Sequence, residues 1–63
     1  MANEKSIEQR IEDATFNVET TVKWIDRLES GEQKPRVENE LSMAKTVLRY
    51  ERSLLSSLQS VKG

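Results

Sequence analysis

The chain has 63 residues, a third of them charged, with a net charge of −1 and with neither cysteine nor histidine. A chain of this length has room for one domain, residues 1–63. The absence of cysteine and histidine excludes disulfides, thiol chemistry and the usual structural zinc sites, and we expect no cofactor. The polar start carries no signal peptide and no apolar run exceeds two residues. These features predict a cytoplasmic protein that does not enter a membrane.

A first helix is predicted over about residues 4–29. Ser6, with Gln9 three residues later, fits a capping box at its start. Apolar or small residues then recur at alternating intervals of four and three, which is the spacing of a coiled-coil seam. The seam residues of this helix are Ile7, Ile11, Ala14, Val18, Thr21, Ile25 and Leu28.

A turn is predicted over about residues 30–34. Gly31 follows Ser30, and glycine takes the left-handed conformation that ends many helices at little cost. Pro35 fits an early position of a second helix, where its missing N–H is not needed. We therefore predict the second helix over about residues 35–61.

The second helix repeats the spacing of the first, with Val37, Leu41, Ala44, Leu48, Glu51, Leu55 and Leu58 at its seam. A short turn makes the two helices antiparallel. The fold class is therefore all-α, an antiparallel two-helix hairpin resembling a coiled coil. In this register Leu28 faces Val37 and Ala14 faces Glu51.

Beside its seam, the second helix carries a further apolar stripe. A two-helix hairpin buries only one stripe per helix, so this second stripe would form an exposed side together with Trp24 of the first helix. The residues of this predicted interface are Trp24, Met43, Val47, Tyr50, Leu54 and Val61. A second copy would cover them in a four-helix bundle, or a different protein would do so.

Catalysis is not expected, because the chain lacks a histidine base, a cysteine nucleophile and a glycine-rich phosphate loop. Glu51 is the one carboxylate at a seam position. Since a buried unpaired charge is costly, we expect Glu51 to pair with a nearby arginine or lysine.

Two further features suggest contacts with partners. Lys45, Arg49 and Arg52 share one face of the second helix, where they would either bind phosphates of RNA or a nucleotide or form a solvated face that balances the acids of the first helix. Phe16 points away from the seam and is a candidate contact with a partner protein.

The predicted function is a small non-catalytic regulator or inhibitor that binds protein and acts as a homodimer. Phage- and plasmid-encoded regulators often have this size. The length and layout resemble small helical-hairpin dimers such as the plasmid copy-number protein Rop, but no motif is shared, so no function follows from the resemblance. The alternative is a protein that binds RNA or a nucleotide through the basic stripe.

Overall fold

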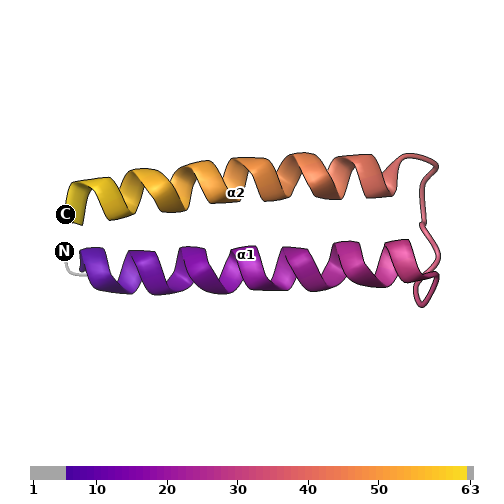
Figure 1. Ribbon diagram of the computed structural model, residues 1–63, viewed down its shortest axis with the longest axis horizontal. Coiled ribbons are helices and arrows are strands. Elements are labelled where there is room, and N and C mark those ends of the chain that lie inside the picture. Colours follow the sequence, from indigo (N-terminus) through magenta and orange to yellow (C-terminus); the bar gives the residue numbers. More distant parts are fainter. Residues whose placement is uncertain (1–5, 63) are drawn as a thin grey trace, which may run out of the picture.

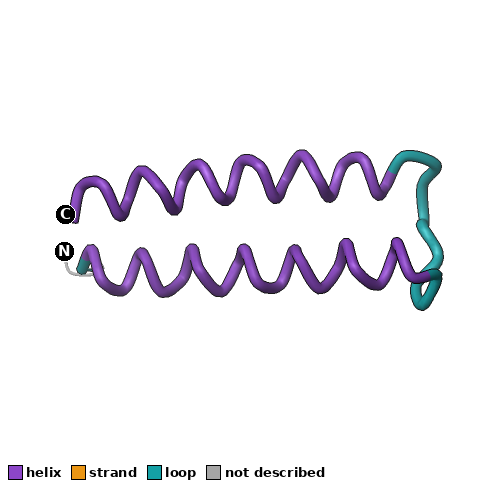
Figure 2. Tube along the Cα trace, in the orientation of Figure 1, coloured by secondary structure: helices purple, strands orange, loops and turns teal. Residues whose placement is uncertain are grey.

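The computed structural model describes residues 6–62, which form two helices, α1 (Ile7–Ser30) and α2 (Glu40–Lys62). The helices run side by side in opposite directions, so the described chain begins and ends at one end of the hairpin and the connection lies at the other (Figures 1 and 2). Residues 6–62 contain no strand. The predicted all-α hairpin is confirmed.

The start of α1 is fixed by Ser6, whose side-chain oxygen accepts a hydrogen bond from the backbone N–H of Gln9 at 3.1 Å. This is one half of the predicted capping box. The other half, in which the Gln9 side-chain oxygen would accept the Ser6 N–H, is absent among the described residues, and the Gln9 side-chain nitrogen donates to Oδ1 of Asp13. The predicted helical residues 4 and 5 lie outside the described part of the chain.

The end of α1 follows the glycine signal. Gly31 has a φ of 84°, the left-handed conformation, and its N–H donates to the carbonyl of Leu28. Gln33 then donates its own N–H to the carbonyl of Arg27 at 3.1 Å and accepts a bond from Arg27 Nε. These bonds satisfy carbonyls that the last turn of a helix leaves without partners.

The second helix begins later than predicted, at Glu40 instead of residue 35. The Glu40 carboxylate accepts the N–H of Arg36 at 2.6 Å, and the Glu40 N–H donates to the carbonyl of Val37. The Glu40 side chain thus binds the Arg36 N–H in the segment where the first turn of the helix was expected. This bond favours a tight turn over an α-helical turn. Val37 consequently lies before α2 and is 51% exposed, so its predicted place on the seam of the second helix is wrong.

The remaining seam residues are among the least exposed residues of each helix. All seven predicted seam residues of α1 are buried or half-buried, and so are those of α2 from Leu41 onward. The buried apolar residues of the described chain are mostly small, however: Ala14, Ile25 and Ala44, the last with no exposed surface. Alanines allow two helices to approach closely, but they contribute little buried area, so the core of this hairpin is thin.

The register also differs from the prediction. Glu51 does not face Ala14; it reaches Thr21, two helical turns closer to the connection. Two causes contribute. The connection spans residues 31–39 and is longer than predicted. In addition, side chains on a helix lean toward its N-terminus, which for α2 is the end near the connection.

Neither α1 nor α2 is both long and apolar enough to cross a membrane, as judged over residues 6–62.

Candidate interaction surfaces

Because its two helices lie side by side, the hairpin has two flat sides, and the helical spacing of 100° per residue shows which residues share each side. On the apolar side, α1 contributes Trp24, and the Trp24 indole meets Glu40 of α2. On the charged side, Glu29 of α1 meets Lys45 of α2. The apolar side comprises Trp24, Met43, Val47, Tyr50, Leu54 and Val61, and the charged side comprises Glu8, Glu12, Glu19, Asp26 and Glu29 of α1 with Lys45, Arg49 and Arg52 of α2.

Every α2 residue of the apolar side is exposed. Tyr50 is 69% exposed, and Val47, the most covered of the five, still has 39% of its surface in contact with solvent. Next to Leu54, the groove between the helices opens into a hollow of about 320 Å³ that is lined by Arg10, Asn17 and Leu58 among others. The apolar stripe predicted from the sequence is therefore an open surface in the single chain.

Trp24 differs from its neighbours because it is only half-buried and has a polar partner. Its Nε1–H donates to Oε2 of Glu40 at 2.9 Å. Buried indole N–H groups usually require such an acceptor. Trp24 therefore supports the connection end of the hairpin as well as belonging to the apolar side.

Glu40, which joins the two helices at the connection end, was not predicted from the sequence. Its side chain is almost fully buried, with 4% of the residue exposed, and it accepts hydrogen bonds from the Arg36 backbone and from Trp24. The Arg36 guanidinium lies 3.8 Å from the same carboxylate. The bond from the Arg36 backbone, assisted by Trp24 and by the charge of Arg36, holds the pKa of Glu40 below its ordinary value, although burial opposes this.

A sequence signal for Glu40 did exist. It precedes Val47 by seven residues, and Leu54 and Val61 follow at the same interval. An interval of seven returns to nearly the same face of a helix, so Glu40 heads the row of α2 that lies beside Trp24. A carboxylate in that row next to an indole N–H donor indicates a hydrogen-bonded pair.

Glu51 has a different partner from the one predicted. The Thr21 hydroxyl donates to Glu51 Oε1 at 2.5 Å, and Thr21 is buried. Within residues 6–62 no arginine or lysine forms an ion pair with Glu51, so the predicted pairing is wrong. A hydroxyl donor satisfies one oxygen of the half-buried carboxylate without burying a second charge.

The predicted phosphate-binding stripe lies on the charged side. Lys45 Nζ is 3.3 Å from Glu29, so one of the three bases already has a carboxylate partner. Arg49 and Arg52 are exposed and form no ion pair within the described part of the chain. The acids of α1 lie beside these bases and weaken the positive potential that a phosphate would meet.

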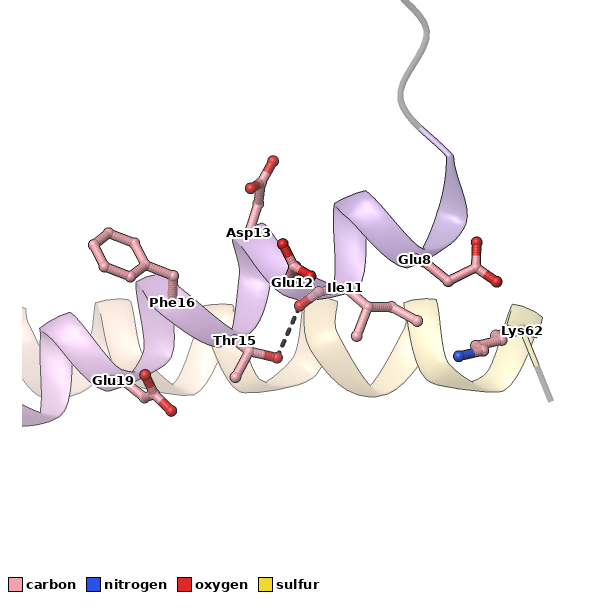
Figure 3. A pocket seen from close by; sticks show the side chains of 8 residues that line it. All are labelled: Glu8, Ile11, Glu12, Asp13, Thr15, Phe16, Glu19 and Lys62. Atoms are coloured by element: carbon pink, nitrogen blue, oxygen red, sulfur yellow. Dashed lines mark hydrogen bonds between the residues drawn. The ribbon is translucent and has the colours of Figure 1, made fainter.

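Phe16 lies on the outside of α1 and is 65% exposed. It borders a groove of about 700 Å³ at the open end of the hairpin, where Lys62 of α2 is the one base among the lining residues that the structure describes. Figure 3 shows the ring directed away from Lys62, between the carboxylate-bearing turns of α1. Four of the eight described lining residues are acidic, so this part of the groove suits a basic segment better than a phosphate. The lining residues are Glu8, Ile11, Glu12, Asp13, Thr15, Phe16, Glu19 and Lys62.

Within residues 6–62, the acidic side chains form no group of three or more that could hold a metal ion. Comparison with known protein families, with curated proteins and with solved structures gives no match to this chain.

Proposed function

We propose that this protein is a small non-catalytic regulator or inhibitor that binds other proteins and acts as a homodimer of helical hairpins. The observation that supports this function most strongly is the open apolar side. Met43, Val47, Tyr50, Leu54 and Val61 lie along one side of α2, interrupted by Ser57, and all five are exposed. Contiguous apolar patches of this kind mark protein–protein contacts more often than idle surface.

The thin core of the hairpin also supports a partner on the apolar side. Within residues 6–62, the buried residues other than Glu40 are two alanines, one isoleucine and one threonine. Each Å² of apolar surface left in water forgoes about 25 cal/mol. A chain of 63 residues without disulfides has little stability to spare, so a partner on the apolar side supplies burial that the hairpin alone lacks.

The test begins with sedimentation of the native chain at micromolar concentration, alongside Val47→Glu with Leu54→Glu. The native chain should sediment as a dimer, and the double variant should sediment as a monomer. Ser53→Glu with Ser56→Glu is a matched control, because both serines are exposed on α2 away from the apolar side. A monomeric native chain contradicts the homodimer.

Protein binding is tested separately by capture from a lysate of the native host. The immobilised native chain should retain at least one protein in stoichiometric amount at physiological salt. Competition with free native chain, but not with a scrambled peptide of the same composition, should release it. If nothing is retained specifically, the regulator or inhibitor function is refuted even if the dimer exists.

Binding of RNA or a nucleotide is the second candidate, and the exposure of Arg49 and Arg52 without ion pairs within residues 6–62 favours it. Phosphate contacts release counterions, so such binding should weaken steeply between about 50 and 200 mM salt. Arg49→Glu with Arg52→Glu should abolish it while leaving the helical circular dichroism unchanged. Full binding by this double variant would rule this candidate out.

A further inference from the structure

We propose that a second copy of the chain covers the apolar side with α2 packed antiparallel on α2, about a twofold axis that passes between Tyr50 and Leu54. This arrangement depends on the homodimer proposed above and specifies it. A twofold axis that crosses the helices places α2 on α2 and α1 on α1. A twofold axis parallel to the helices would instead place α2 on α1.

The distribution of apolar surface separates these two arrangements. The exposed apolar side chains of this side all come from α2. The α1 residues that flank the half-buried Trp24 on the same side are polar and exposed, among them Arg10, Asn17 and Thr20. Packing α2 on α1 would therefore press apolar side chains onto polar ones and remove their water. Packing α2 on α2 buries apolar surface against apolar surface.

The positions along α2 also suit an antiparallel pair. The stripe runs from Met43 to Val61, and its midpoint falls between Tyr50 and Leu54. An antiparallel partner centred there brings Met43 of one copy to Val61 of the other and Tyr50 of one copy to Leu54 of the other. The small Ser57 then faces Val47, so the gap in the stripe is filled from the other copy.

The charges do not oppose this contact. Lys45, Arg49 and Arg52 lie on the charged side, where Lys45 bonds to Glu29, so these three bases do not meet across the proposed axis. Glu40 is already satisfied by Trp24 and Arg36 within its own hairpin. All neighbouring helices in the resulting bundle are antiparallel, which also sets their dipoles in opposition.

The available area is sufficient. The hairpin measures 41 × 23 × 15 Å, and its flat sides are the two larger faces, as Figure 1 shows. A face of 41 × 23 Å can supply the roughly 800 Å² per partner that a standard specific interface buries.

The arrangement is tested by distances between spin labels on single-cysteine variants, which is straightforward because the native chain has no cysteine. Suitable sites are Ser42→Cys, Ser53→Cys and Ser60→Cys, since these serines are exposed and outside the apolar side. With a rise of 1.5 Å per residue, the two copies of site 53 would be offset along the helix axis by only about 3 Å. The copies of sites 42 and 60 would be offset by roughly 30 and 24 Å.

The expected result is a short distance at site 53 and much longer distances at sites 42 and 60. Three equal distances would show that α2 packs on α1 and would overturn the inference, while the homodimer and its regulatory function would stand. No measurable distance at any site, with a monomer in sedimentation, would also overturn it. In that case binding of a different protein by the apolar side would still be tested by the capture experiment.

Discussion

The two ends of the hairpin are held together by different kinds of contact. From the connection to the middle of α2, buried and half-buried polar groups join the helices: Trp24 bonds to Glu40 beside the connection, and Thr21 bonds to Glu51 at the middle of α2. At the open end the seam consists of Ile7, Ile11, Leu55 and Leu58, all of them half-buried. Hydrogen bonds between specific atoms fix one register, whereas partly buried aliphatic side chains tolerate small shifts. We therefore expect the connection end to define the register and the open end to open first.

The largest expected effect compares one substitution at the two ends. Ile25→Ala, at a buried position near the connection, should lower the free energy of unfolding by about 2–4 kcal/mol. Ile7→Ala, at the half-buried start of α1, should lower it by only about 1 kcal/mol. Urea unfolding followed by circular dichroism, at one fixed protein concentration, measures both. Equal losses would show that the two ends are equally well packed.

The next effect is the dependence of stability on pH through the Glu40 carboxylate. Because the folded-state pKa of Glu40 lies below its ordinary value of 4.5, the ionised carboxylate stabilises the fold above about pH 4.5. This stabilisation is lost as the pH falls through the lower folded-state pKa. Glu40→Gln should therefore be less stable than the native chain at pH 7, and the difference should shrink by pH 3.

Thermal unfolding of both proteins between pH 3 and pH 7 checks this prediction. Glu38→Gln is the matched control, because Glu38 is exposed in the same segment. A gap between native chain and Glu40→Gln that stays constant with pH would mean that the shape of the side chain, and not its charge, supports the connection end.

Thr21 and Thr15 give a comparison within α1. The Thr21 hydroxyl bonds across to Glu51, whereas the Thr15 hydroxyl bonds at 2.8 Å to the Ile11 carbonyl of its own helix. Thr21→Val leaves a half-buried carboxylate without that donor and should cost about 1–2 kcal/mol. Thr15→Val should change stability by less than about 0.5 kcal/mol. Matching losses would indicate that Glu51 finds another donor easily.

The smallest effect belongs to the ion pair between Lys45 and Glu29. Both side chains are about half exposed, so Lys45→Ala should cost only about 0.2–1 kcal/mol. The loss should disappear in 1 M salt, because salt screens exposed charges. Denaturant midpoints at low and high salt measure it, and a loss that persists at 1 M salt would point to packing by the lysine stem.

The sequence predicted the repeating features of this molecule well. Both seams, the left-handed Gly31 and the apolar stripe from Met43 to Val61 follow from spacing or from the properties of one residue type. The features it did not predict depend on pairs of residues far apart in the chain. Glu40 binds the Arg36 backbone, and Trp24 reaches the same carboxylate from α1; together they occupy the segment where Pro35 suggested a helix start.

The register error has the same origin. The spacing that aligned Ala14 with Glu51 carries no information about the length of the connection or about the tilt of side chains along each helix. A shift of a few residues leaves the seam apolar, so the pattern alone does not distinguish the alternatives. The hydrogen bond from Thr21 to Glu51 does distinguish them.

The connection has two parts, one hydrogen-bonded to the end of α1 and the other to the start of α2. Gln33 bonds only backward, to Arg27, and Arg36 bonds only forward, to Glu40, among the hydrogen bonds of the described residues. Lys34 and Pro35 join them as an exposed dipeptide. A flexible insert between these two residues should therefore leave both helix ends intact. Doubling the length of such a loop costs only about 0.6 kcal/mol, so this point would accept a peptide epitope or a second domain.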